Sequence, residues 1–364
     1  MFRISEVRYI TTTGKLVNCM ALDTLILADD LTGALDSAVG FSGGGRSVIV
    51  ARSPVAVPEA LARAPNVLAI NTSSREIRAE DAARRVGEAL AHLDPAAVGR
   101  VLKKVDSRLK GNIMAEVEAL ERWFAPDRRV ACPAIPGMGR RVTHGALEGS
   151  GVDQPIPVAD CFVGRVEVPD VASDADLDEV VQGGTGRVLW IGARGLAFAL
   201  ARASGVAAPE VTRLQPSVMI ANGSRDPVTR AQIATLGGRV TRLDAPDGIV
   251  PEGTAPHGRL VLSISDGGAG ISGLEAAARF ARGTAQLARQ VKPAALLICG
   301  GESAQAVLDQ FGLNSLQVSA ELRPGLPVCE VQTDWGRVQV VTKSGGFGAP
   351  GLLAEILDET VMQR

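Results

Sequence analysis

The chain has 364 residues, of which 46% are hydrophobic and 21% charged, a composition typical of folded proteins and unlike that of disordered ones. Its 38 Lys and Arg residues nearly balance 40 Asp and Glu residues. The resulting net charge of −2 leaves no basic surplus for a nucleic-acid backbone. No apolar stretch approaches the roughly 18 residues that span a bilayer, so we expect neither nucleic acid nor a membrane as a partner.

Residues 1–22 lack the apolar core and the cleavage site of a secretory signal. Periodic sequence begins at Asp23, and we therefore expect a poorly ordered extension before it, with Met20 as an alternative start. The five cysteines are scattered, odd in number and without a CxxC spacing, which supports neither a disulfide framework nor a zinc site. This cysteine usage fits a reducing cytoplasm, which is the location we expect.

From Asp23 the chain alternates short β-branched runs with helical stretches rich in Ala, Leu and Arg. The predicted strands are 24–28, 47–51, 67–71, 100–105, 129–132 and 187–191, and the predicted helices are 33–41, 79–93, 112–124 and 195–203, with a further helix that starts at Ser173-Asp174. Strands that are apolar along their whole length and separated by helices are typical of a parallel sheet covered on both faces. The pattern is loose and Gly/Pro-rich between residues 133 and 170.

Residues 204–216 have the composition of a linker, and a second α/β series follows them. Its predicted strands are 217–222, 260–265, 294–299 and 337–342. At roughly 100–200 residues per domain, the length also indicates two domains. We therefore predict two three-layer α/β domains, residues 23–205 and 217–364, with mainly parallel sheets and a ligand cleft between them.

Two adjacent aspartates follow the strand predicted at 24–28. Asp29 or Asp30 can cap the next helix by accepting hydrogen bonds from its free N–H groups. A second carboxylate exceeds what a cap needs and repels the first, so a cation, a metal ion or a substrate hydroxyl must offset the repulsion. Because ligands bind at the carboxyl ends of strands in open α/β sheets, we favour a functional role for the pair.

Basic residues follow the neighbouring strands. Period-2 alternation sends Lys103 and Lys104 to opposite faces, so only one of them can reach a given site, and a purely structural ion pair with Asp106 is the alternative interpretation. The turns after these strands carry Arg75, Asp106, Arg108 and Arg140. Guanidinium groups bind carboxylates through paired hydrogen bonds, and aspartates accept from hydroxyls, so this sheet edge suits a small polyhydroxy carboxylate.

The second half contains glycine-rich turns between a strand and a helix. They are Asn222-Gly223-Ser224, Gly300-Gly301-Glu302-Ser303 and Lys343-Ser344-Gly345-Gly346. Glycine lets the backbone approach an anion, and a helix N-terminus offers unpaired N–H groups with a favourable dipole. Three such turns in one domain, one of them with a lysine, predict a phosphate-binding site.

Two other functions stay open. Residues 268–273 match GxGxxG after a predicted strand, as in a NAD(P)-dependent dehydrogenase, although the acidic residue expected about 20 residues further on is missing. A non-catalytic protein that binds a sugar acid is the second alternative. The P-loop pattern GxxxxGK(S/T) does not occur, and the three histidines are isolated, so we predict no cluster of metal-binding side chains.

The motifs at residues 27–34, 103–107, 111–112, 300–303 and 343–348 together resemble those of the four-carbon acid sugar kinases. The likeness runs from about residue 23 to the C-terminus with every motif in order. It implies an acid-sugar-binding domain, a nucleotide-binding domain, and ATP-dependent phosphorylation of the terminal hydroxyl of threonate, erythronate or 3-oxo-tetronate. Arg108 and Lys110 stand where the family usually has Thr and Arg, and Asn222 stands where it usually has Ser.

The resemblance also implies roles for individual residues. Asp30 is the expected base, with Asp29 or Asp106 as substitutes. The residues expected to contact the sugar acid are Asp29, Arg75, Lys104, Asp106 and Arg108. Among them, Arg75 and Lys104 are expected to hold its carboxylate, with Arg108 as a further candidate. The expected nucleotide contacts are Ser224, Gly300, Gly301, Glu302, Ser303, Ser344, Gly345 and Gly346, with Mg²⁺ bridging the ATP phosphates. The partners are then a sugar acid and ATP, and a homodimer stays open.

Overall fold

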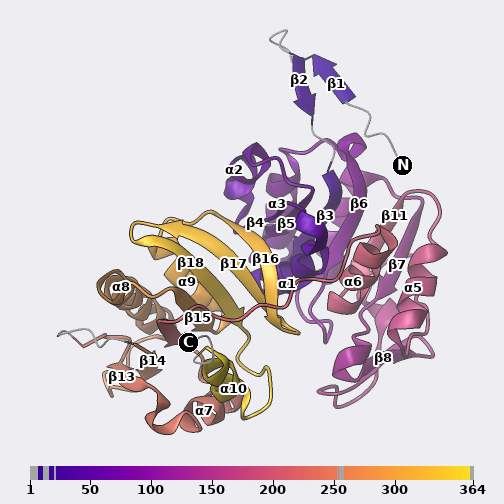
Figure 1. The fold of residues 1–364 in the computed structure, drawn as a ribbon. Coiled ribbons are helices and arrows are strands. Elements are labelled where there is room, and N and C mark those ends of the chain that lie inside the picture. The colour runs from indigo at the N-terminus through magenta and orange to yellow at the C-terminus, as the bar shows by residue number, and fades with distance from the viewer. Residues whose placement is uncertain (1–6, 11–15, 20–21, 252, 254–257, 361–364) are drawn as a thin grey trace. The chain divides into compact units, whose positions relative to one another are not determined.

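A computed structural model of the chain describes residues 7–10, 16–19, 22–251, 253 and 258–360 (Figure 1). The chain divides into two compact units, Met1–Pro209 and Glu210–Arg364. This division falls inside the segment 204–216 that the sequence indicated as a linker. Each unit has its own series of neighbouring strands, its own helices and its own buried residues.

The described residues before Leu22 form one pair of strands. β1 (Val7–Ile10) and β2 (Leu16–Cys19) run antiparallel to each other. No strand was predicted in this extension, so the β1–β2 pair is an addition to the predicted elements. The other residues of the extension, Met20 among them, lie outside the described residues, so the character of the whole extension stays a prediction.

The first unit has a parallel sheet with the strand order β4-β5-β3-β6-β11-β7. Its strands are β3 (Leu22–Ala28), β4 (Val48–Ala51), β5 (Val67–Asn71), β6 (Val98–Lys104), β7 (Arg128–Cys132) and β11 (Val188–Gly192). All residues of β4, β5 and β11 are buried. Both faces of the sheet must therefore be covered, as a parallel sheet requires, and the predicted strands are confirmed to within two residues.

Helices cover both faces of this sheet. They are α1 (Leu31–Ala38), α2 (Val57–Ala62), α3 (Ala79–Leu90), α4 (Ile113–Phe124), α5 (Asp174–Gln182) and α6 (Arg194–Ala203). The connection through α1 moves across the sheet in one direction and the connection through α3 in the other, so right-handed crossovers place them on opposite faces. In agreement, α1 contacts α6 while α3 contacts α4. Ser173 is the N-cap of α5, which confirms the predicted start of this helix, and Asp176 completes a capping box with it.

The Gly/Pro-rich stretch that the sequence left irregular contains a small antiparallel sheet. Its strands are β8 (Arg140–Thr143), β9 (Ala146–Gly149) and β10 (Ile156–Pro157). Strands of two to four residues are too short to show an alternating pattern, and for this reason the sequence did not predict them.

The second unit has a mixed sheet with the order β13-β14-β12-β15-β18-β17-β16. Its strands are β12 (Val218–Asn222), β13 (Thr241–Pro246), β14 (Leu260–Ser265), β15 (Ala295–Cys299), β16 (Ser315–Arg323), β17 (Leu326–Thr333) and β18 (Gly336–Lys343). The strands from β13 to β18 in this order are parallel, and β17 and β16 add antiparallel pairs. The sheet is thus mainly parallel, as predicted, although β13, β16 and β17 were not predicted.

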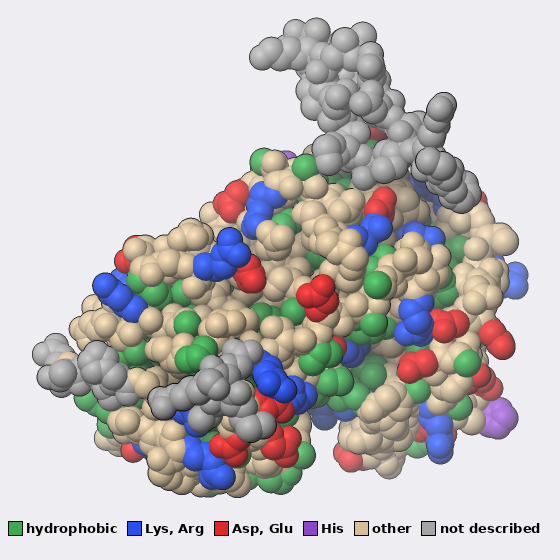
Figure 2. Space-filling view, in the orientation of Figure 1, with side chains coloured by type: hydrophobic (Ala, Val, Ile, Leu, Met, Phe, Trp, Pro, Cys, Tyr) green, Lys and Arg blue, Asp and Glu red, His purple; other side chains and the backbone are tan. Residues whose placement is uncertain are grey.

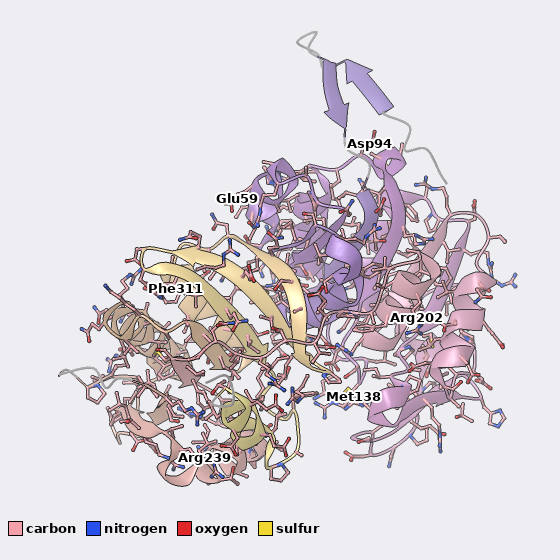
Figure 3. All side chains as sticks on the ribbon, viewed as in Figure 1. Glu59, Asp94, Met138, Arg202, Arg239 and Phe311 are labelled. Atoms are coloured by element: carbon pink, nitrogen blue, oxygen red, sulfur yellow. The ribbon has the colours of Figure 1, made fainter. Side chains whose placement is uncertain are left out.

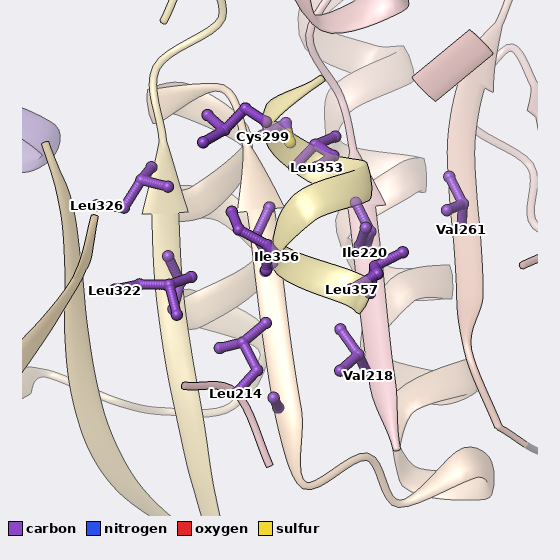
Figure 4. Close-up of a cluster of buried hydrophobic side chains, with 14 of the residues drawn as sticks. Leu214, Val218, Ile220, Val261, Cys299, Leu322, Leu326, Leu353, Ile356 and Leu357 are labelled. Atoms are coloured by element: carbon purple, nitrogen blue, oxygen red, sulfur yellow. The ribbon is translucent and has the colours of Figure 1, made fainter. Parts of the chain in front are cut away.

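In the described part of this unit, four helices pack on the sheet: α7 (Pro227–Ala234), α8 (Gly273–Val291), α9 (Gly301–Gln310) and α10 (Leu352–Glu359). α7 contacts α10, and α8 contacts α9. Under α10, the side chains of Leu353, Ile356 and Leu357 meet Val218 and Ile220 of β12 in one apolar cluster (Figure 4). Among the described helices, none has a run of apolar residues long enough to cross a bilayer.

The two lysines of β6 point to opposite faces, as predicted. Lys103 is fully buried, and its ammonium group lies 3.0 Å from a carboxylate oxygen of Glu116 on α4. Glu116 also accepts a hydrogen bond from the Ser74 hydroxyl. The alternative partner inferred from the sequence, Asp106, is therefore wrong for Lys103, because this side chain turns toward α4. The pair fixes α4 against the sheet.

Replacement of Glu116 by Gln leaves Lys103 buried without an anion, and we expect the free energy of unfolding to fall by about 3–5 kcal/mol. Glu118 lies on the same helix and is exposed, so Glu118→Gln serves as the control, with an expected change within about 0.5 kcal/mol. Urea denaturation followed by circular dichroism measures both variants. Equal stabilities would contradict a stabilising role for the buried pair.

Candidate functional site

Acidic and basic side chains gather at the carboxyl ends of three neighbouring strands of the first unit, β5, β3 and β6. Asp29 and Asp30 follow β3, Arg75 follows β5 after a short turn, and Asp106 follows β6. The sheet order therefore brings together side chains that are far apart in the chain. On the face shown in Figure 2, acidic and basic side chains are likewise interspersed.

Arg75 is the centre of this cluster. Its Nε lies 2.8 Å from Asp29 Oδ2, and its Nη2 lies 2.9 Å from Asp29 Oδ1, a two-point contact. Its Nη1 lies 3.2 Å from Asp30 Oδ2 and 3.8 Å from Asp106 Oδ2. The sequence predicted that Arg75 binds the carboxylate of a substrate. In the structure its guanidinium group contacts carboxylates of the protein itself.

Asp29 is only 2% exposed. Burial alone would raise its pKa, but the charges of Lys103, Arg75 and Lys104 hold the pKa of Asp29 below its ordinary value. The carboxylate is therefore ionised at neutral pH. Because the pKa is lowered on folding, this ion pair stabilises the fold above the ordinary Asp pKa, and the stabilisation is lost only as the pH falls through the lowered value.

Asp30 differs from Asp29 in exposure and in partners. Its side chain is 25% exposed. It caps α1, since Oδ1 accepts a hydrogen bond from the Gly33 N–H at 2.9 Å and Oδ2 accepts one from the Thr32 hydroxyl at 2.6 Å. Of the two adjacent aspartates, Asp30 is thus the one that a ligand in solvent can reach.

Lys104 lies on the face of the sheet that carries α1. Its ammonium group donates to the Val105 carbonyl at 2.7 Å, and the side chain is only 5% exposed. A Cβ atom on Gly33 would lie 2.9 Å from this ammonium group, so the first turn of α1 approaches closely only because residue 33 is glycine. Within the described part of the chain, no carboxylate oxygen lies within 4.0 Å of the Lys104 ammonium.

The loop after β6 is shaped by Asp106 and Gly111. Asp106 Oδ1 accepts a hydrogen bond from the Arg108 N–H at 2.9 Å. Gly111 has a φ of +96°, and a Cβ atom there would lie 3.2 Å from Asp29 Oδ2. Asn112 then donates to the carbonyls of Ser74 and Ile77, both at 2.8 Å. The Gly-Asn motif, which the sequence identified only through the resemblance, therefore joins this loop to the turn that carries Arg75.

The three glycine turns of the second unit follow β12, β15 and β18, which are neighbours in the sheet. α9 begins after Gly300, which has a φ of +101° and provides no side-chain cap for the first N–H groups. A Cβ atom on Gly223 would lie 2.0 Å from Ser303 Oγ, and one on Gly345 would lie 2.5 Å from Ser224 Oγ. The structure thus brings together the predicted nucleotide residues of all three turns.

Lys343 was part of the argument for a phosphate site, but its side chain is fully buried. Its ammonium group donates to Thr229 Oγ1 at 2.9 Å and to the carbonyls of Ser344 and Gly345 at 3.1 and 3.2 Å. Burial lowers the pKa of Lys343. The lysine therefore holds the turn from inside. Its partner Thr229 lies 114 residues away in the chain, and no local pattern indicates the contact.

The GxGxxG match at 268–273 has a different environment. Asp247 accepts hydrogen bonds from the N–H groups of Gly267 and Ala269 at 3.0 and 3.1 Å. Asp266 accepts from the N–H of Gly268 at 2.9 Å. Carboxylates thus take the amides that a dinucleotide-binding turn offers to a pyrophosphate, which argues against the dehydrogenase alternative. Among the described residues, no group of three or more His, Cys, Asp or Glu side chains is arranged to hold a metal ion.

Comparison with known proteins gives consistent results for both halves. A family model described as a sugar-binding N-terminal domain matches residues 24–159, and one described as a nucleotide-binding C-terminal domain matches residues 263–353. A D-threonate kinase of Bordetella bronchiseptica is 30% identical over 90% of this chain and 95% of its own length.

Other similar proteins agree. A 3-oxo-tetronate kinase of Methylobacterium radiotolerans is 26% identical over 93% of this chain and 99% of its own length. A crystal structure of a protein from Salmonella typhimurium has the same fold, with a TM-score of 0.71 at 18% identity over 94% of this chain and 99% of its own. The chain belongs to the four-carbon acid sugar kinase family.

Proposed function

We propose that this protein is an ATP-dependent kinase that phosphorylates the terminal hydroxyl of a four-carbon sugar acid. The observation that carries the proposal is the set of glycine turns at the ends of β12, β15 and β18, around a helix α9 whose first N–H groups have no side-chain cap. Such N–H groups and the helix dipole favour phosphate. The names of the relatives, D-threonate kinase and 3-oxo-tetronate kinase, support the substrate class.

On the nucleotide side, the ATP phosphates lie against backbone N–H groups of the turns at 300–303 and 344–346, with the Ser224 hydroxyl nearby. Mg²⁺ prefers one or two carboxylates together with phosphate oxygens and water. Asp226 and Glu302 supply carboxylates at these turns, so the donor set fits the ion. When bound, Mg²⁺ neutralises charge on the transferred phosphoryl group.

On the acceptor side, Asp30 accepts the proton of the attacking hydroxyl. Its exposure, 25% against 2% for Asp29, supports this choice between the adjacent aspartates. Asp29 holds Arg75 through its two-point contact, and Arg75 in turn fixes the position of Asp30. Lys104 and Asp106 complete the charged edge that faces the sugar acid. We also propose a cytoplasmic location, since Cys132, Cys161, Cys299 and Cys329 are free thiols.

The proposed activity is tested by incubation with Mg-ATP and a panel of threonate, erythronate and 3-oxo-tetronate stereoisomers. We expect release of ADP that depends on one of these acids, and no change in the absorbance of added NAD(P)H. Calorimetry with Mg-ATP accompanies the assay. Binding of Mg-ATP and of an acid without any ADP release would instead support the non-catalytic alternative.

Replacement of Asp30 by Asn retains a good helix cap but removes the proton acceptor. We expect kcat to fall by about 10²- to 10⁴-fold while Mg-ATP binding is retained. Asp94, labelled in Figure 3, is a matched control because it also caps a helical turn, where it accepts from the Ala96 N–H at 2.9 Å. Asp94 precedes β6, so it lies away from the carboxyl end of that strand, where the site residues gather. An unchanged kcat in Asp30→Asn would remove Asp30 from the role of base.

Replacement of Gly345 by Ala places a Cβ atom 2.5 Å from Ser224 Oγ and forces two of the nucleotide turns apart. We expect Mg-ATP to bind about 10-fold more weakly, the cost of one charge-assisted hydrogen bond. The control is Gly238→Ala in the same unit, where a Cβ atom meets nothing within 4 Å. Calorimetry of each ligand separately should show that sugar-acid binding is retained in both variants; equal Mg-ATP affinities would exclude a phosphate site at this turn.

A further inference from the structure

The β8–β9 hairpin of the first unit directs Arg140 toward the loop after β6. Arg140 opens β8, two residues after Met138, which is labelled in Figure 3. Its Nη1 donates to the Ser107 hydroxyl at 2.9 Å, and its Nε donates to the Ser150 carbonyl at 2.8 Å. Both of these oxygens are neutral, so neither contact compensates the charge of the guanidinium group.

Arg140 and its neighbour Arg141 differ in this respect. The Arg141 side chain is 59% exposed and forms an ion pair with Glu148 across the hairpin at 2.7 Å. Arg140 is only partly exposed, and among the described residues no carboxylate oxygen lies within 4.0 Å of its guanidinium group. Arg108, which follows Ser107 in the chain, is exposed, and no carboxylate oxygen of the described residues lies within 4.0 Å of its guanidinium group either. Within the hairpin, Glu148 therefore neutralises the charge of Arg141, which faces solvent, whereas the charge of Arg140 is not neutralised.

The two uncompensated arginines are close enough to affect each other. Burial and the positive charge of Arg108 both lower the pKa of Arg140, and Asp106 opposes this effect. Two like charges held beside each other are unfavourable unless an anion joins them. Asp106 offers little compensation, because its Oδ1 accepts from the Arg108 N–H and its Oδ2 faces Arg75.

The other cations of this edge are less suited to an anionic ligand. Arg75 already contacts both Asp29 and Asp30, and Lys104 is only 5% exposed and donates to the Val105 carbonyl. The formal charge of this edge is −1 when Asp29, Asp30, Asp106, Arg75 and Lys104 are counted, and a net negative charge repels an acid. Inclusion of Arg108 and Arg140 brings the sum to +1.

We propose that Arg108 and Arg140 together bind the carboxylate of the sugar acid, and that they, not Arg75 and Lys104, determine the preference for an acid over a neutral sugar alcohol. The assignment rests on the proposed sugar-acid kinase function of this chain. Paired guanidinium groups are suited to a planar carboxylate, which each of them can bind through charge-assisted hydrogen bonds. The hydroxyl end of the substrate then faces the aspartates around Arg75.

The test compares a four-carbon sugar acid with the corresponding four-carbon polyol, which lacks the carboxylate. For Arg140→Gln and for Arg108→Gln, we expect kcat/KM for the acid to fall by about 10- to 100-fold, the cost of hydrogen bonds to a charged group. We expect kcat/KM for the polyol and KM for ATP to change by no more than about twofold, since neither involves the lost contact. Arg141→Gln is the matched control, for which we expect values like those of the unaltered enzyme.

Equal losses for the acid and the polyol would overturn the proposal, because the arginines would then act on the transferred phosphoryl group or on the fold. Unchanged kcat/KM for the acid would overturn it as well. Circular dichroism identifies a folding defect in Arg140→Gln, and Arg108→Gln then decides, since the Arg108 side chain is exposed. If the unaltered enzyme released no ADP with any acid, the proposed function would fail. Calorimetry of the acid with the unaltered protein and both variants would still test whether Arg108 and Arg140 bind the carboxylate.

Discussion

The first unit concentrates three carboxylates at one edge of its sheet, and the contacts around this edge depend on how their negative charge is balanced. Asp29 and Asp30 are adjacent in the chain, and Asp106 joins them from the next strand. Arg75 bridges Asp29 and Asp30, and two lysines lie behind them on either face of β6. Despite its burial, Asp29 has a lowered pKa because of the charges of Lys103, Arg75 and Lys104. Lys103 needs its own anion, Glu116, so the electrostatic balance of the edge extends into the core.

The second unit uses backbone groups, rather than a cluster of charged side chains, to form the proposed site for an anion. Its turns offer backbone N–H donors beside the carboxylates of Asp226 and Glu302, and Lys343 is turned inward, where it donates to carbonyl oxygens. Serine hydroxyls fill the space that the glycines leave, which is why Gly223 and Gly345 cannot carry a Cβ atom without displacement of a neighbour. The two units therefore favour different ligands for physical reasons: one offers side-chain charges for a hydroxy acid, the other amides for phosphate.

Much of this organisation could be predicted from the sequence, because buried parallel strands are continuous apolar runs and the residues after them are identifiable. What could not be predicted are partners set by tertiary structure. Nothing local indicates that Arg75 binds Asp29, or that Lys103 meets Glu116. The β16–β17 hairpin, which was not predicted, does have a local signal, because Pro324-Gly325 separates two apolar runs.

The hairpin that carries Arg140 lies outside the parallel sheet that carries the aspartates. It is closed locally, with the Ser150 N–H bonded to the Gly139 carbonyl at 3.0 Å, and it is anchored by the buried side chains of Val142 and Leu147. Substitutions at the exposed positions of such a hairpin are tolerated far better than changes in a buried strand. On the roles proposed for Arg140 and Asp30, divergence in this hairpin alters which acid is chosen while the proton acceptor stays intact, so that selectivity and chemistry evolve separately.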